Sequence, residues 1–207
     1  GWATCRRPGE AGLPTRSKTP TITRMSHYRR SKHGVLFFLT WVTHNRRDIF
    51  SHSSARDLLR NAIEATRRDH PWETEAIVLL PDHLHMLWRL PETDNDYSRR
   101  MGVIKKRFTR AYLASGGAEG EVSASQKRQG NRGIWQKRFW EHSIRDARDF
   151  YMHIDYIHAN PVKHGHVEFA RDWPHSSFHR YIELGWYESD WAGRIDLPGT
   201  VEYLSVD

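Results

Sequence analysis

The sequence predicts an α+β protein in which an antiparallel sheet carries helices packed on one face, in the order β-α-β-β-α-β-α. Apolar, β-rich runs alternate with segments whose apolar residues recur at helical spacing. Two of the expected strands are separated only by a tight turn, which indicates a hairpin. With 207 residues, 38% of them hydrophobic, the chain can bury one sizeable core. We therefore expect one main domain.

The first half of this domain contains a strand, a helix and a hairpin. Residues 35–43 are apolar and β-rich, as in a buried strand. A helix capped by Ser53 or Ser54 extends to about residue 69, with apolar residues at helical spacing. Residues 76–80 and 83–90 form two further strands around a turn at Pro81.

The second half alternates helix, loop, strand and helix. A helix is expected over residues 97–114, and a strand over 139–145. Between them, residues 115–133 are rich in Gly, Ser, Gln and Arg and predict a mobile basic loop. The last helix runs from about residue 147 until Pro161 stops it.

Both ends of the chain differ from the domain at 25–182. Residues 1–24 contain prolines and lack periodicity, so we expect a disordered N-terminal extension. Residues 183–207 are acidic but contain Trp186, Tyr187 and Trp191, so this tail is expected to pack on the domain.

Charge, cysteine content and hydropathy limit the class of protein. The net charge is +7, and eleven Lys and Arg residues against two acidic ones lie between Arg99 and Arg138. Such segregation favours an anionic partner, although a solvated helix face and loop would show the same pattern. The apolar run Val35 to Val42 is too short to span a bilayer. Cys5 is the only cysteine, which excludes an intrachain disulfide and favours a cytoplasmic protein.

A candidate metal site lies on the second strand of the hairpin. His83 and His85 flank Leu84, so both imidazoles point to one face of the strand while Leu84 points into the core. Two neighbouring imidazoles are typical ligands of one divalent ion. Because the chain has 14 His residues, a chance pair is the alternative. The pair His164 and His166 is weaker, since it follows the helix stop and encloses a glycine.

A candidate nucleophile lies on the last helix. Phe150, Ile154 and Ile157 form its apolar stripe, and Tyr156 lies roughly 120° from that stripe. Asn160 follows four residues later, so the two side chains are neighbours. The alternative is structural: the tyrosine forms a hydrogen bond at the helix edge, and the asparagine caps the helix.

These residue types fit the chemistry of a phosphodiester. A divalent cation held by two neutral imidazoles and an amide oxygen keeps positions open for phosphate oxygens. Tyrosine has a pKa near 10 and needs a cation or a base to act as a nucleophile. Attack by tyrosine instead of water conserves the bond energy in a phosphotyrosine, which permits rejoining.

Two stretches resemble one known family. Residues 80–88, LPDHLHMLW, resemble the HUH motif of the bacterial REP-associated tyrosine transposases, which are IS200-like. Residues 156–165, YIHANPVKHG, resemble the tyrosine helix of that family, in the same order and at a similar distance. Other blocks also match in order, so the resemblance covers nearly everything from residue 25 to about residue 193.

The resemblance implies a ferredoxin-like HUH domain that binds REP-type hairpins and cuts single-stranded DNA. It implies a 5′-phosphotyrosine intermediate with a free 3′-OH. Carried over by residue, Tyr156 is the nucleophile, His83 and His85 are metal ligands, and Asn160 is the third ligand. Mg²⁺ or Mn²⁺ is the implied cofactor, and either a monomer or a homodimer is expected.

Three sets of residues are candidates for DNA contacts. Phosphate contacts are expected in the basic segment, at Arg99, Arg100, Lys105, Lys106, Arg107 and Arg110. Stacking on unpaired bases is expected around Trp135 and Arg138, with Phe139 and Trp140 nearby, although core burial is the alternative for two of the three aromatics. Bases beside the hairpin stem are expected to be read by Tyr28, Arg29 and Arg30.

Three other functions share some of these features. A regulatory protein derived from a transposase would bind the hairpin without cutting it, and would not need the four site residues together. A replication initiator or relaxase would use the same chemistry on another substrate, but the chain contains no helicase-like domain. A metallonuclease that activates water would not need Tyr156.

Overall fold

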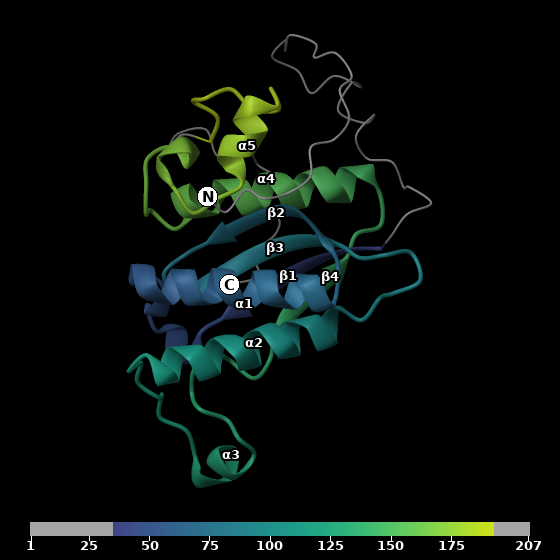
Figure 1. Ribbon diagram of the computed structural model, residues 1–207. Helices are drawn as coiled ribbons and strands as arrows, with labels where there is room; N and C mark the ends of the chain where they lie inside the picture. Colours follow the sequence, from purple (N-terminus) through teal and green to yellow (C-terminus); the bar gives the residue numbers. More distant parts are fainter. Residues whose placement is uncertain (1–34, 193–207) are drawn as a thin grey trace.

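The computed structural model describes residues 35–192 as a four-stranded sheet between two layers of helices (Figure 1). Predictions for the N-terminal extension, for Tyr28, Arg29 and Arg30, and for residues 193–207 lie outside the described residues. None of the helices in the described part is long and apolar enough to cross a membrane.

All strand pairs of the sheet are antiparallel, as predicted. The strands are β1 (Leu36–Val42), β2 (Glu73–Leu79), β3 (His83–Arg89) and β4 (Trp140–Ser143), in the spatial order β2-β3-β1-β4. The hairpin of β2 and β3 is confirmed. Because β3 and β1 are the central strands, side chains on them are buried on both faces of the sheet.

The helices cover both faces of the sheet, so the prediction that they all pack on one face is wrong. Helices α1 (Ser53–Asp69) and α2 (Tyr97–Ala114) lie on one face, and α4 (Ala147–Lys163) and α5 (Phe178–Glu183) lie on the other (Figure 1).

The reason for two layers is the sequence of β1. Phe37, Leu39 and Trp41 point towards α1 and α2, whereas Leu36 and Phe38 point towards α4. Side chains alternate along a strand, so an uninterrupted apolar run has two faces to bury. One layer of helices can cover only one of them.

Two segments differ from the sequence-based prediction in detail. The loop over residues 115–133 contains the short helix α3 (Ala124–Arg128), which begins with a capping box of Ser123 and Gln126. Helix α4 continues through Pro161 to Lys163. Pro161 lacks a backbone N–H, but only one further turn follows it, and the backbone N–H groups of His164 and His166 close that turn by donating to Asn160 and Pro161.

Candidate active site

The two histidines of the candidate metal site lie on the face of β3 that α4 covers. His83 and His85 are almost fully buried, and their ring centroids are 5.0 Å apart. Leu84 points to the opposite face, into the core beneath α1 and α2. The alternation predicted from the sequence is therefore confirmed.

Each imidazole has one ring nitrogen in contact with a neighbouring polar side chain. Nδ1 of His83 lies 2.5 Å from a carboxylate oxygen of Asp82, and Nδ1 of His85 lies 2.8 Å from the hydroxyl of Thr40. Contacts of this kind orient metal-binding histidines and leave Nε2 for the ion. The Nε2 atom of His83 is buried and has no hydrogen-bond partner among residues 35–192.

Asp82 is held in its ionised form. Burial alone would raise the pKa of its carboxyl group, but the hydrogen bond and charge of His83, together with Arg46, lower that pKa below its ordinary value. The guanidinium of Arg46 lies 3.0 Å from the second carboxylate oxygen. An ionised carboxylate behind an imidazole increases its basicity as a metal ligand.

Tyr156 lies directly beside this pair of histidines. Its ring centroid is 5.1 Å from that of His85, in an edge-to-face arrangement, and 5.9 Å from that of Phe38. The side chain is 0% exposed. Tertiary packing thus brings the predicted nucleophile to the predicted metal ligands, in a closed environment.

Asn160 lies one helical turn beyond Tyr156 and is also fully buried. Neither its amide oxygen nor its amide nitrogen has a hydrogen-bond partner in the described part of the chain. A buried amide without partners costs about 1–3 kcal/mol. A divalent cation would give this amide and Nε2 of His83 the partner that each lacks. The residues present therefore fit the expected metal.

Two further residues lie at this site, although the sequence did not predict them there. The ring centroid of His164 lies 5.0 Å from that of His83, although His164 belongs to the pair ranked lower on spacing. Nζ of Lys163 lies 5.0 Å from the ring centroid of Tyr156. Lys163 follows Tyr156 by seven residues, which is two helical turns. Helical spacing therefore places Lys163 on the same side of the helix as Tyr156, and this was the signal in the sequence.

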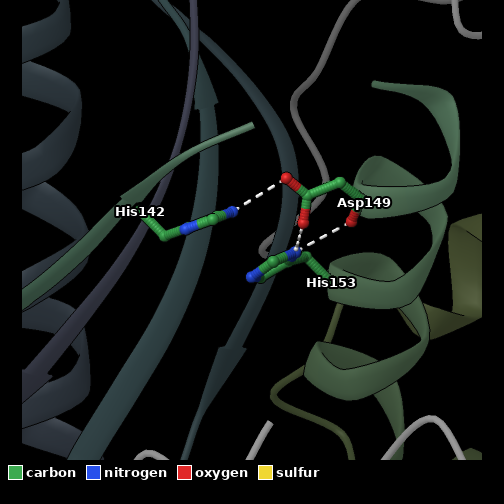
Figure 2. Close-up of side chains that lie close together, drawn as sticks. All are labelled: His142, Asp149 and His153. Atoms are coloured by element: carbon green, nitrogen blue, oxygen red, sulfur yellow. Dashed lines mark hydrogen bonds and ion pairs between the residues drawn. The ribbon is translucent and has the colours of Figure 1, made fainter. Parts of the chain in front are cut away.

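A third group of polar residues lies beside the site. His142, Asp149 and His153 converge where β4 meets α4, and short polar contacts connect them (Figure 2). The ring of Phe38 lies between this group and the site, since its centroid is 4.7 Å from that of His153 and 5.5 Å from that of His85.

The structure corrects two of the expected DNA contacts. Arg100 is buried and forms two hydrogen bonds with the carboxylate of Asp94, so it stabilises the start of α2 and is not available to phosphate. Trp135 is 8% exposed and packs against the rings of Trp41 and Phe108 in the core. The exposed aromatics of this segment are Phe139 and Trp140.

The other basic candidates fall into two groups. Arg107 pairs with Asp69 on α1, at 2.6 Å, and Nζ of Lys105 packs over three aromatic rings. The basic candidates whose side chains are exposed, and therefore accessible to the phosphates of DNA, are Arg99, Lys106, Arg110 and Arg138.

Several of these basic residues line a groove between α2 and the segment that contains α3. Its volume is about 850 Å³, and its lining includes Lys105, Lys106, Arg110, Lys127, Arg132 and Lys137 with one acidic residue, Glu119.

Comparisons with known proteins identify the family of this chain. The family model described as "Transposase IS200 like" matches residues 31–160. A REP-associated tyrosine transposase of Escherichia coli (strain K12) is 43% identical over 173 residues, which are 83% of this chain and 93% of that protein. A protein of Haemophilus influenzae that is provisionally given the same name is 42% identical over 84% of this chain and 97% of its own length.

A solved structure of a REP-associated tyrosine transposase bound to a REP hairpin has the same fold. Its TM-score is 0.64, its sequence identity is 44%, and the match covers 80% of this chain and 90% of that one. The predicted resemblance and the α+β fold are confirmed. The chain belongs to the family of IS200-like transposases.

Proposed function

We propose that this protein cleaves and rejoins single-stranded DNA beside REP-type hairpins, with Tyr156 as the nucleophile. The observation that carries the proposal is the short separation of the Tyr156 ring from the paired imidazoles, 5.1 Å to the ring of His85. The names of its relatives, and the relative bound to a REP hairpin, support this class of substrate.

The proposed reaction is a transesterification at one phosphodiester. The phenol oxygen of Tyr156 attacks phosphorus, so that an O–P bond to tyrosine forms while the bond from phosphorus to the 3′-oxygen breaks. The phenol loses its proton, and the leaving 3′-oxygen gains one. The products are a 5′-phosphotyrosine and a free 3′-OH, and rejoining is the reverse of the same step.

The proposed ligands of Mg²⁺ or Mn²⁺ are His83, His85 and Asn160. Support comes from the buried nitrogen of His83 and the buried amide of Asn160, which have no hydrogen-bond partner in the described part of the chain. When bound, the ion would supply positive charge that stabilises the charge developing on the phosphate. The ammonium group of Lys163 adds a positive charge close to the Tyr156 ring.

The basic groove and the site lie on different faces of the sheet, and β4 is the edge strand between them. We infer that the hairpin backbone contacts the exposed cations of the groove, including Lys106 and Arg110. The unpaired strand then passes the edge at Phe139 and Trp140, whose exposed rings suit stacking on bases. Since Tyr156 is buried, the bound state must open the packing around it.

The test uses a labelled single-stranded hairpin incubated with the protein and Mg²⁺ or Mn²⁺, followed by denaturing electrophoresis. A covalent protein–DNA adduct is expected for the wild type and not for Tyr156→Phe. Tyr97→Phe serves as the matched control, because that tyrosine lies at the start of α2 and packs on Phe37.

Each rival function gives a different result in the same assay. Cleavage that persists in Tyr156→Phe without an adduct would indicate a metallonuclease that uses water. Hairpin binding without cleavage under either metal would indicate a regulatory hairpin-binding protein, and the proposal would be wrong.

A further inference from the structure

A second set of metal-ligating side chains joins the edge strand to the tyrosine helix. His142 comes from β4, and Asp149 and His153 come from α4 (Figure 2). The two residues on α4 are four apart and therefore share a helix face. Each residue offers a ligand atom within 4.8 Å of the ligand atoms of the other two. We propose that these three residues bind a divalent transition-metal ion, such as zinc, at a site separate from the pair of His83 and His85.

The three side chains are already held close to the geometry of a coordination sphere. Nε2 of His142 lies 2.8 Å from one carboxylate oxygen of Asp149, and Nδ1 of His153 lies 3.1 Å from the other. Ligand atoms around a tetrahedral zinc ion stand about 3.3 Å apart, given metal–ligand distances of about 2.0–2.1 Å. An ion bound between His142 and Asp149 would require these two ligand atoms to separate by about 0.5 Å.

The carboxylate of Asp149, which contacts both imidazoles, is fixed from behind. The backbone N–H of Arg145 donates to Asp149 at 3.0 Å. Burial would raise the pKa of Asp149, but this bond and the contact with His142 lower it overall, so the carboxylate is ionised as a ligand must be. Support from the backbone is typical of metal-binding carboxylates.

The imidazole of His153 is in a form that a metal requires. Burial lowers its pKa, only partly opposed by Asp149, so the ring is neutral near pH 7. Its Nδ1 atom also lies 2.8 Å from the backbone oxygen of Asp149, so Nε2, which is buried without a hydrogen-bond partner among residues 35–192, is the nitrogen left for an ion. A buried polar atom of this kind is a place where an ion or an ordered water is expected.

The site also has an entry path and an open coordination position. The side chain of His142 is 25% exposed, whereas those of Asp149 and His153 are almost fully buried. Arg145 lies 3.3 Å from the Asp149 carboxylate, but its side chain is 76% exposed and can turn into solvent when an ion enters. Water can therefore complete the coordination from the side of His142.

The donor set favours late transition metals. Two imidazoles and one carboxylate suit zinc, cobalt or nickel, whereas Mg²⁺ prefers an all-oxygen environment. Phe38 on β1 contacts the rings of both His153 and Tyr156. By holding His153 in place against Phe38, a bound ion would fix the position of α4 on the sheet.

Metal content of the full-length protein tests the proposal without any measurement of cleavage. Protein stripped with a chelator is loaded with Zn²⁺, dialysed, and measured by elemental analysis and native mass spectrometry. His142→Ala should lose one equivalent of zinc relative to the wild type. The double variant His83→Ala/His85→Ala should retain one equivalent, and adding His142→Ala to it should remove that equivalent.

Two controls separate this site from incidental binding and from misfolding. His52→Ala changes an exposed histidine at the start of α1 and should leave the zinc content unchanged. Asp149→Asn keeps the size of the side chain and should lose the same equivalent as His142→Ala, with far-UV circular dichroism unchanged.

The same measurements can overturn the site. If the double variant His83→Ala/His85→Ala retains no zinc, or if His142→Ala and Asp149→Asn bind as much zinc as the wild type, the three residues form only a hydrogen-bonded network. Either result leaves the proposed cleavage by Tyr156 untouched, since that proposal concerns a different set of ligands.

Discussion

Asp82 controls the orientation of the first proposed metal ligand. Its two carboxylate oxygens contact different partners, Nδ1 of His83 at 2.5 Å and the guanidinium of Arg46 at 3.0 Å. The carboxylate thereby fixes which nitrogen of His83 faces the site. Residues that act behind a metal ligand in this way typically contribute 10–100-fold to metal affinity.

Replacing Asp82 by Asn is therefore expected to weaken metal binding more than it changes the chemical step. The Mn²⁺ concentration for half-maximal cleavage of hairpin DNA should rise about 10–100-fold, with a much smaller change in rate at saturating Mn²⁺. Asp57→Asn is the matched control, because Asp57 also pairs with an arginine but lies on the surface of α1. Equal Mn²⁺ dependence in Asp82→Asn and the wild type would show that the carboxylate does not support the ligand.

At the level of elements, α2 uses its basic residues for two different purposes. Lys106 and Arg110 are exposed, whereas Lys105 turns inward, with Nζ 5.4–5.7 Å from the ring centroids of Trp41, Trp135 and Phe139. Burial lowers the pKa of Lys105 to about 8. Attraction of the cation to the aromatic faces opposes this desolvation, at about 0.5–2 kcal/mol per good contact.

Removal of this buried charge is expected to change how stability depends on pH. The folded-state pKa of Lys105 lies below the ordinary lysine value of 10.5, so the unfolded chain binds more protons between about pH 8 and pH 10.5. The wild type should gain stability as pH rises through that range, by up to about 3 kcal/mol before the aromatic contacts are counted. Lys105→Met should be more stable than the wild type at pH 7, and the difference should shrink by pH 10.

Urea unfolding at several pH values measures this effect, and Lys106→Met is the exposed control. Other titrating groups are common to all three proteins and cancel in the differences. A constant difference between Lys105→Met and the wild type from pH 7 to pH 10 would contradict the predicted titration.

Across the whole molecule, the exposed cations of the groove and the proposed catalytic groups are separated by the sheet. The groove that contains Lys106 and Arg110 is formed by α2 and the segment around α3, while Tyr156 belongs to α4, on the opposite face of the sheet. A substrate that reaches both must be longer than one nucleotide, which suits a hairpin with an unpaired strand attached.

Neutralising two groove cations should reduce the salt dependence of hairpin binding. For Lys106→Ala combined with Arg110→Ala, the slope of log affinity against log salt should become shallower by about 1.4–1.8, because each lost phosphate contact contributes about 0.7–0.9. Fluorescence anisotropy with a labelled hairpin at several salt concentrations measures the slope. Arg171→Ala, in the 3-10 helix at Ala170–Asp172 near α5, should leave the slope unchanged. An unchanged slope in the double variant would exclude the groove as the phosphate-binding surface.

The sequence by itself determined those features that follow from local periodicity. Alternation along β3 places His83 and His85 on one face, and helical spacing places Tyr156 and Asn160 one turn apart, whatever the rest of the chain does. The order of strands and long helices follows from the same local patterns, and it agrees with the structure, which adds the short helices α3 and α5.

Only the tertiary structure decided which of these faces meet. Contacts between segments far apart in the chain bury Arg100 and Trp135 and place His164 beside His83. Such contacts also place a layer of helices on the second face of the sheet. The meeting of His142 with Asp149 and His153 depends on tertiary packing in the same way. Covalent geometry fixes the direction of a side chain relative to its own strand or helix, but its partners depend on how those elements pack, which no local pattern of residues specifies.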